Sequence, residues 1–275
     1  MNLWLAAFGS TVCALAGVAL GRWCSRWRSP YWTLGYFLPM VLVVVYGLAY
    51  HVPALLFQPP VSWMMMGLRK FAVMGFIATL VLTTPLSRVP ERRNRVAIGV
   101  LMALIVFFMS IWPFIAPMVD RQSLSQLHTQ IDEHGICIQT TGYTCGPAAA
   151  VTGLRQLGLP AEEGQIAILS CTSAQEGTPT DMLSAALNRQ YGADGLTAQC
   201  RAFHSVGELK QAGLTLAVVK YGLLVDHWVA VLAVTDSAVI IGDPLGGRQQ
   251  LSYEEFAERW RFVGIVLHRQ GTTKT

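Results

Sequence analysis

The sequence predicts a protein of two parts, an α-helical membrane domain followed by a globular α+β domain. The chain is 53% hydrophobic and only 13% charged, and the apolar excess is concentrated before residue 119. Beyond that point helical patterns come first and strand-like runs later, which is the order of an α+β domain with an antiparallel sheet. We therefore expect a transmembrane domain over 1–118, a polar connector over 119–134 and a folded domain over 135–270.

Four apolar stretches in the first part are long enough, or nearly so, to cross a hydrocarbon core of about 30 Å. They cover residues 3–20, 34–57, about 71–86 and 96–118. The third is short, and the segment 58–67 before it has the composition of an interfacial or re-entrant piece. The first has no basic residue before it, so we interpret it as an anchor and not as a cleavable signal peptide. Gly17 and Gly21 form a G-x-x-x-G pattern, which we interpret as ordinary span composition because glycine is common in spans.

The basic residues indicate how the spans are oriented. Arginines gather after the first span and between the third and fourth, namely Arg22, Arg26, Arg28, Arg88, Arg92, Arg93 and Arg95. Only Arg69 and Lys70 lie between the second and third spans. By the positive-inside rule both arginine-rich loops are cytoplasmic. We therefore expect an integral protein of a bacterial inner membrane, with the lipid bilayer as a partner and the folded domain on the periplasmic or outer side.

The formal charge of +4 is divided unequally along the chain. Residues 1–118 hold nine basic and one acidic residue, whereas residues 119–275 hold eleven basic and fifteen acidic residues. The basic excess thus belongs to membrane topology. Because the second part has no basic stripe with interleaved aromatic residues, we expect no nucleic-acid partner.

The segment Gln139-Thr-Thr-Gly-Tyr-Thr-Cys145-Gly-Pro places a cysteine at the start of a predicted helix, six residues after a side-chain amide. Thr144 is expected to cap this helix and Gly158 to end it. A helix N-terminus stabilises a thiolate, which is the nucleophilic form of cysteine. The Gln139 amide and the Cys145 backbone N–H are suited to stabilise the oxyanion of a tetrahedral intermediate. The pattern predicts a thiol nucleophile with its oxyanion donor.

A β-hairpin is predicted further along, with His227 near the start of its first strand and Asp243 at the end of its second. In this hairpin His227 lies across from Asp243, or diagonal to it, within cross-strand reach. Two competing acids fit less well. Asp226 is adjacent to His227, so strand alternation turns its side chain to the other face, and Asp236 lies at the distant turn. Asp243 is therefore the predicted partner that orients the His227 imidazole.

The other elements of the second part follow from helix-start signals and apolar runs. Capping boxes are expected to open helices at Thr178, Ser205 and Ser252. A short helix is predicted over 162–169, and strands over 214–221 and 262–268.

The chain has six cysteines, two of them in or beside the first span. An oxidising compartment permits one disulfide among Cys137, Cys171 and Cys200, and we predict Cys137 with Cys171. No C-x-x-C or H-x-x-x-H spacing is present, so we predict no zinc site.

Residues from about 130 to 268 resemble cysteine peptidase family thirty-nine, the bacteriocin-processing, double-glycine leader peptidase type, which is papain-like. The resemblance rests on Gln139, on the Cys145-Gly-Pro-Ala entry to a helix, and on His227 and Asp243 with Gly-Asp-Pro ending the strand. It implies a papain-like fold and a Cys-His-Asp triad with Gln139 in the oxyanion hole. It also implies a peptide or protein substrate and hydrolysis of a peptide bond without a metal or organic cofactor.

The arrangement departs from the family pattern in one respect. Members of that family often form the N-terminal part of an export ABC transporter, whereas here the resembling domain is C-terminal. The chain also has no G-x-x-x-x-G-K-[ST] loop, so we expect no ATP hydrolysis by it and regard any export machinery as a separate partner.

Two other function classes remain open. One is an acyl transferase of the transglutaminase type, which would use the same Cys-His-Asp triad. The other is an inactive membrane-tethered peptide-binding module, against which the intact Cys145, His227, Asp243 and Gln139 argue.

Overall fold

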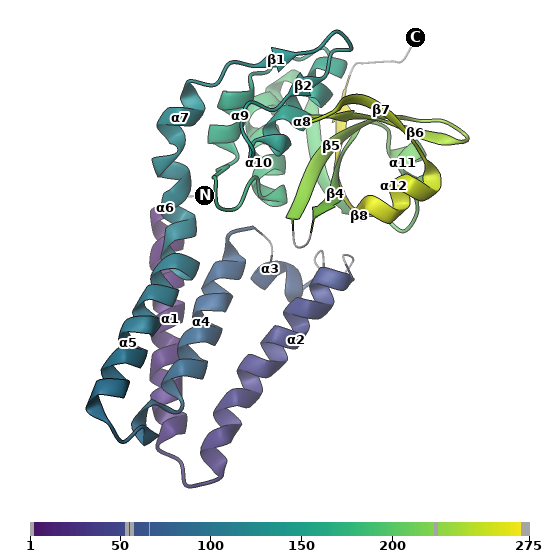
Figure 1. The fold of residues 1–275 in the computed structure, drawn as a ribbon. Coiled ribbons are helices and arrows are strands. Elements are labelled where there is room, and N and C mark those ends of the chain that lie inside the picture. The colour runs from purple at the N-terminus through teal and green to yellow at the C-terminus, as the bar shows by residue number, and fades with distance from the viewer. Residues whose placement is uncertain (1–2, 53–54, 56–57, 66, 223–224, 271–275) are drawn as a thin grey trace. The chain divides into compact units, whose positions relative to one another are not determined.

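The structure is a computed structural model that describes residues 3–52, 55, 58–65, 67–222 and 225–270. The chain divides into two compact units, Met1–Ala116 and Pro117–Thr275. The described elements of unit 1 are helices, and unit 2 combines helices with β-sheets (Figure 1). The predicted connector 119–134 lies within unit 2, where it carries a short helix and a short strand.

Unit 1 is built of apolar helices. In chain order they are α1 (Leu3–Ser25), the 3-10 helix η1 (Tyr31–Tyr36), α2 (Phe37–His51), α3 (Val61–Met65), α4 (Arg69–Thr83), the 3-10 helix η3 (Leu86–Arg88), α5 (Arg92–Val106), the π-helix η4 (Phe107–Ile111) and α6 (Trp112–Val119). Four segments are long and apolar enough to cross a membrane: Leu3–Ser25, Tyr31–Ala49, Arg69–Arg88 and Arg92–Ser125. The predicted architecture of four apolar helices before an α+β domain is thus confirmed.

Two of the predicted membrane segments include residues that the structure does not describe. The last residues of the predicted second span include 53, 54, 56 and 57, which lie outside the described residues. The segment 58–67, expected as an interfacial or re-entrant piece, contains the five-residue helix α3, and residue 66 is likewise outside the described part.

Helices α1 and α4 pack closely through Gly17 and Gly21, which corrects our interpretation of this G-x-x-x-G pattern as ordinary composition. A Cβ atom on Gly17 would lie 2.6 Å from the Phe76 carbonyl oxygen, and one on Gly21 would lie 2.8 Å from the Thr83 Cβ. Such distances are too short for any side chain, so only glycine lets the two helices approach this far. Without a hydrophobic drive between helices in lipid, close backbone approach of this kind supplies the packing energy.

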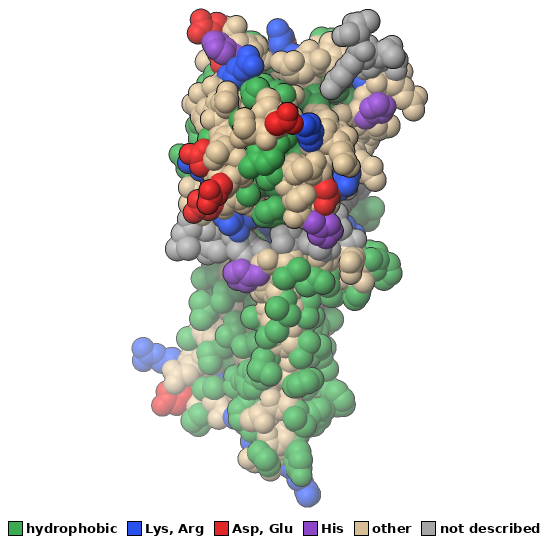
Figure 2. Space-filling view, turned by 90° about the vertical axis from the view of Figure 1, so that its right-hand side faces the viewer, with side chains coloured by type: hydrophobic (Ala, Val, Ile, Leu, Met, Phe, Trp, Pro, Cys, Tyr) green, Lys and Arg blue, Asp and Glu red, His purple; other side chains and the backbone are tan. Residues whose placement is uncertain are grey.

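The surfaces of the two units differ in character. In Figure 2 hydrophobic side chains cover most of the visible face of unit 1, whereas charged side chains are spread over the visible face of unit 2. Exposed apolar residues of unit 1 include Trp4, Leu5, Phe8, Leu15, Phe37, Met40, Val43, Leu48, Val96, Val100 and Leu104. An apolar surface of this extent is typical of a protein part that lies in lipid.

Unit 2 contains a six-stranded antiparallel sheet in the order β3-β8-β4-β5-β6-β7 and a two-stranded sheet of β1 and β2. Its helices are α7 (Arg121–Ser125), α8 (Cys145–Gln156), α9 (Glu163–Leu169), α10 (Thr180–Tyr191), the 3-10 helix η5 (Gly192–Asp194), α11 (Val206–Ala212) and α12 (Tyr253–Arg259). Its strands are β1 (Gln130–Ile131), β2 (Cys137–Ile138), β3 (Leu196–Ala202), β4 (Thr215–Gly222), β5 (Val225–Val234), β6 (Ala238–Asp243), β7 (Gly247–Ser252) and β8 (Trp260–Arg269).

Helices cover both faces of the large sheet, with α8 and α10 on one side and α12 on the other (Figure 1). Strand alternation sends one set of side chains to each side. On the α12 side the buried cluster consists of Phe203, Val206, Leu209, Ala217, Val219, Val229, Val231, Val239, Ile241, Phe256 and Trp260. On the α8 side Gly242 allows close contact, because a Cβ there would lie 3.1 Å from the Cγ2 of Thr152 in α8 and 2.7 Å from the Cδ1 of Ile136. This packing fixes α8 against the strands that carry the predicted site.

Only one of the three predicted capping boxes is formed. Ser252 and Glu255 exchange both hydrogen bonds at the start of α12. The helices predicted at Thr178 and Ser205 are present, but neither residue caps with its side chain. The Thr178 hydroxyl instead pairs with the Thr172 hydroxyl at 2.8 Å in the buried interior. Tertiary contacts thus replace the local cap.

The predicted Cys137–Cys171 disulfide is wrong, since both thiols are free. Cys137 is fully buried in β2, where its backbone N–H donates to the Thr152 hydroxyl of α8. Burial, reinforced by the negative charge of Glu163, raises the pKa of the Cys137 thiol to about 12. A thiol in this setting is an inert core residue.

Candidate active site

Helix α8 begins at Cys145, and this position rests on contacts with neighbouring segments. Thr144 occupies the N-cap position but does not cap with its side chain, contrary to expectation. Its hydroxyl instead accepts the Thr141 N–H at 3.2 Å and so closes the turn before the helix. Gly146 follows, and a Cβ there would lie 2.7 Å from the Thr178 Cβ. Glycine is therefore required next to Cys145 for the segment before α10 to approach.

His227 and Asp243 meet across the β5–β6 hairpin as predicted. The turn closes through a hydrogen bond from the Thr235 N–H to the Ala238 carbonyl oxygen at 2.9 Å. Ala230 pairs with Gly242, so the register places Asp243 two positions from His227, on the same face. The His227 Nε2 lies 2.7 Å from the Asp243 Oδ1, and both side chains are largely buried.

Asp243 is held as a carboxylate by several donors. Its Oδ1 also accepts the Leu245 N–H at 2.8 Å, and its Oδ2 accepts the Gln249 amide at 3.4 Å. Burial alone would raise the pKa of Asp243, but the hydrogen bond to His227 and the backbone donors outweigh it and lower that pKa. Asp243 therefore stays ionised beside the imidazole.

His227 connects Asp243 to Cys145. Burial lowers the pKa of His227, but its hydrogen bonds to Asp243 and to the Cys145 side chain outweigh this effect and raise the pKa to about 9. Because Nε2 faces Asp243, the remaining ring nitrogen, Nδ1, is the one available to Cys145. The geometry thus supports an imidazolium placed between a carboxylate and the thiol sulfur.

The two competing acids are engaged elsewhere. The Asp226 Oδ1 accepts the Arg261 Nε–H at 2.8 Å, on the other side of the strand from Asp243. Asp236 pairs with Lys210 at the hairpin turn, 2.6 Å from its Nζ. The predicted ranking of Asp243 above both agrees with these contacts.

Gln139 lies in the loop before α8 and is fixed at its backbone and its side chain. Its N–H donates to the Pro244 carbonyl oxygen at 3.0 Å, which ties it to the residue after Asp243. Its Nε2 donates to the Thr141 carbonyl oxygen at 2.8 Å. Its Oε1 is buried and has no hydrogen-bond partner within the described part of the chain. The amide nitrogen carries two hydrogens, so one N–H remains for another acceptor.

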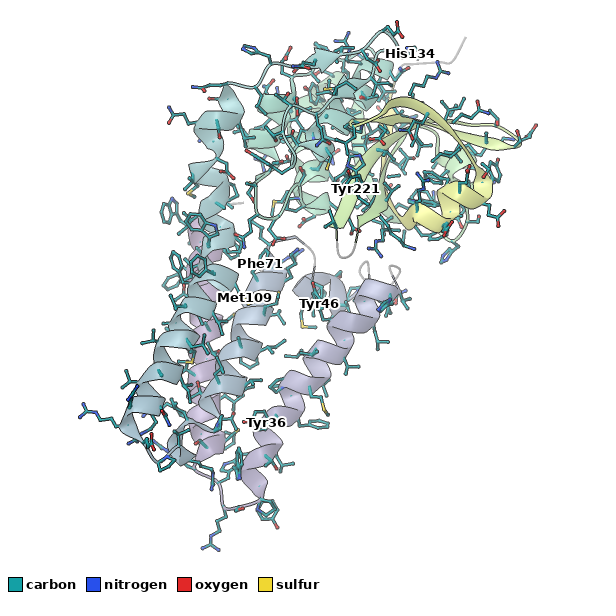
Figure 3. The ribbon with its side chains drawn as sticks, in the orientation of Figure 1. Tyr36, Tyr46, Phe71, Met109, His134 and Tyr221 are labelled. Carbon is teal, nitrogen blue, oxygen red and sulfur yellow. The ribbon has the colours of Figure 1, made fainter. Side chains whose placement is uncertain are left out.

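The structure adds supporting residues that the sequence analysis did not identify. Gln249 contacts Asp243 from β7, a strand that was not predicted. Trp228 donates its Nε1–H to the Thr178 carbonyl oxygen at 3.3 Å and so ties the residue after His227 to the segment beside Gly146. Tyr221 at the end of β4 (Figure 3) lies against His227, with ring centroids 5.6 Å apart. Among the described residues, no group of three or more His, Cys, Asp and Glu side chains is arranged to hold a metal ion.

Comparison with known proteins agrees with this fold. Residues 133–272 match the Peptidase C39 family. The chain is 30% identical over 132 residues to an uncharacterised protein of Methanothermobacter marburgensis. The matched region covers 48% of this chain and 87% of the relative. The chain is 28% identical over 141 residues to an uncharacterised protein of Methanothermobacter thermautotrophicus, covering 51% of this chain and 92% of the relative.

Two solved structures are similar to this chain at low sequence identity. The peptidase domain of Streptococcus ComA, a bifunctional ABC transporter of a quorum-sensing pathway, has 21% identity and a TM-score of 0.43, covering 52% of this chain and all of that domain. A double-glycine-motif protease from an AMS/PCAT transporter, solved with its leader peptide, has 18% identity and a TM-score of 0.41, covering 53% of this chain and 96% of that protease.

The fold of unit 2 and the match over half of the chain define a peptidase-like α+β domain. The chain belongs to the Peptidase C39 family. In this chain the family domain follows four candidate membrane spans.

Proposed function

We propose that this chain is a membrane-anchored cysteine peptidase that cleaves peptide bonds by covalent thiol catalysis. One observation carries the proposal: His227 interacts with the Cys145 side chain at the start of α8, and Asp243 orients His227 at 2.7 Å from its Nε2. A nucleophile paired with a base, and a base oriented by a third group, is the arrangement that thiol hydrolysis requires.

The reaction assigns one task to each of these groups. The Cys145 sulfur attacks the carbonyl carbon of the scissile bond, and the oxyanion that forms is stabilised by the Cys145 backbone N–H and the free N–H of the Gln139 amide. The His227 imidazolium then gives its proton to the leaving amine, which leaves a thioester on Cys145. Neutral His227 next takes a proton from water, and the hydroxide attacks the thioester carbonyl and releases the acid product and the thiolate.

The proposed substrate is a peptide with a double-glycine sequence before the scissile bond. Family membership supports this class, as does the leader peptide bound to the similar transporter protease. Exposed apolar side chains also flank the paired residues. Tyr221 beside His227 is 67% exposed, and Leu245, whose N–H binds Asp243, is 48% exposed. These side chains are available to contact an extended apolar peptide.

Hydrolysis is tested with the full chain in detergent micelles and a fluorogenic peptide that carries Gly-Gly before a coumarin amide. We expect coumarin release, with slower release from a matched Val-Val peptide. Adding hydroxylamine or glycine amide should leave the acid product dominant in water. If the amide or hydroxamate product instead greatly exceeds the acid product at a low millimolar concentration of the amine, the protein is an acyl transferase. No coumarin release and no labelling of Cys145 by a peptidyl vinyl sulfone would indicate a binding module.

We also propose that unit 2 acts on the periplasmic or outer side of a bacterial inner membrane. The support is the set of seven arginines at or just after the end of the first candidate span, at the end of the third and at the start of the fourth. An alkaline phosphatase fused after residue 275 should be active in cells, and green fluorescent protein at the same point should be dark when exported through the Sec pathway. The reverse pattern would place unit 2 in the cytoplasm.

A further inference from the structure

Glu163 at the start of α9 is a fully buried carboxylate, with 0% of its surface exposed. Its Oε1 accepts the Thr140 N–H at 3.0 Å, and its Oε2 accepts the Thr140 hydroxyl at 2.5 Å. Burying a charge is costly unless donors compensate it. Both of these hydrogen bonds join the Glu163 side chain to Thr140, the residue directly after Gln139.

The contacts around Gln139 fix both peptide groups that flank its Cα atom. The peptide group before it is held by the hydrogen bond from the Gln139 N–H to the Pro244 carbonyl oxygen. The peptide group after it carries the Thr140 N–H, which Glu163 binds. With both planes fixed, the φ and ψ angles of Gln139 are determined, because they are the only soft backbone torsions of a residue. The direction in which its side chain leaves the backbone is therefore fixed as well.

We propose that Glu163 is a positioning residue that aims the Gln139 amide at the oxyanion. The inference rests on the proposed function, because it assigns to Gln139 the donor role in acylation. An oxyanion donor stabilises the transition state only when it is held in place before the reaction. Loss of Glu163 should therefore slow acylation while substrate binding stays nearly constant.

A purely structural role for Glu163 predicts a different result. The Glu163 backbone N–H donates to the Thr129 hydroxyl at 2.9 Å, so this residue also helps to seat α9. If the side chain served only the stability of unit 2, its loss would affect every property of the site, including the reactivity of Cys145. If it acts through Gln139, its loss should have no effect once Gln139 has been removed.

The test is a double-mutant cycle of Glu163→Ala and Gln139→Ala in the full chain. The probes are single-turnover acylation by the Gly-Gly coumarin amide and alkylation of Cys145 by iodoacetamide, which forms no oxyanion. Gln139→Ala should slow acylation by roughly 10²–10³-fold. Glu163→Ala should approach that loss in the wild-type background and change the rate less than about threefold in the Gln139→Ala background. The alkylation of Cys145 is measured by mass spectrometry of the peptide that contains it. Its rate should stay near the wild-type rate in both single variants and in the double variant.

Matched variants keep the test decisive. Glu162→Gln alters the neighbouring exposed carboxylate, which binds Thr129 and not Thr140, and should acylate like wild type. If Glu163→Ala fails to fold, Glu163→Leu takes its place, and Glu163→Gln, whose side-chain oxygen can still accept the Thr140 N–H, should restore most of the rate.

Three results would overturn the positioning role. The first is acylation by Glu163→Ala at the wild-type rate. The second is a loss of acylation rate from Glu163→Ala that is as large in the Gln139→Ala background as in the wild-type background. The third is a fall in the rate of Cys145 alkylation that matches the fall in the rate of acylation. A wild-type chain whose Cys145 is alkylated but never acylated would overturn the proposed function and the role of Glu163 together.

Discussion

Replacing Cys145 by alanine is expected to abolish peptide cleavage and leave unit 2 folded. The change removes the only atom that forms the thioester, and no neighbouring group replaces it. In hydrolases that act through a covalent triad, removal of the nucleophile alone costs on the order of 10⁶-fold in rate. The fold should tolerate the change, because alanine is the best helix former and Cys145 lies at the first position of α8. The cost in stability should be about 1 kcal/mol.

Coumarin release from the Gly-Gly peptide and the thermal transition of the purified chain measure both expectations. Cys200→Ala is the matched control, since it removes a different thiol of unit 2; the Cys200 side chain is partly buried, and burial raises its pKa. That variant should cleave at the wild-type rate. Residual cleavage by Cys145→Ala near the wild-type rate would exclude the thiol mechanism.

The sequence predicted the central strands of unit 2 and not its edges, for a physical reason. Strands β4, β5, β6 and β8 occupy the middle of the sheet and carry apolar runs that reveal them. Strands β3 and β7 lie at the two edges, and their residues alternate between exposed and less exposed positions. Edge strands with polar side chains produce no apolar run, so their existence depends on neighbours that the sequence does not show. Gln249, which binds Asp243, was missed because it lies on β7.

The candidate site was predictable where its parts are local. The role of Cys145 was predicted from its place at the start of a helix. The pairing of His227 with Asp243 was predicted from one hairpin with a short turn. The contact between Glu163 and Thr140 joins residues 23 positions apart on separate elements. An acidic residue in the first turn of a helix is ordinarily explained by the helix dipole, so nothing in the sequence separated Glu163 from that default.

Local motifs failed where tertiary contacts competed for the same groups. Thr178 begins a capping-box pattern in the sequence, yet its hydroxyl pairs with the Thr172 hydroxyl and its Cβ packs beside Gly146. Glycine in a membrane span is common enough that Gly17 and Gly21 carried little signal. Their importance appears only when the backbone of α4 is seen to pass within contact distance. In each case the deciding fact is a neighbour that is remote in sequence.

Loss of His227 is expected to remove nearly all turnover, whereas Asp243→Asn should be milder. Without the imidazole, the Cys145 thiolate has no cationic partner and the leaving amine has no proton donor, losses that are worth roughly 10²–10⁴-fold for acid–base catalysis alone. Asp243→Asn keeps a hydrogen-bonding side chain at Nε2, and papain-like enzymes function with an asparagine in this place. His204→Ala, which alters an exposed histidine, is the control and should cleave like wild type.

The pH dependence of acylation separates the role of Asp243 from general damage to the site. With the His227 pKa raised to about 9, the imidazolium is present below that pH and is lost as the pH rises through it. The wild-type rate should therefore fall on a basic limb near pH 9. In Asp243→Asn the carboxylate no longer stabilises the imidazolium, so burial prevails and the limb should move to lower pH. Gln139→Ala should lower the whole profile without moving its limb. An unmoved limb in Asp243→Asn, together with a shifted one in Asp226→Asn, would transfer the orienting role to Asp226.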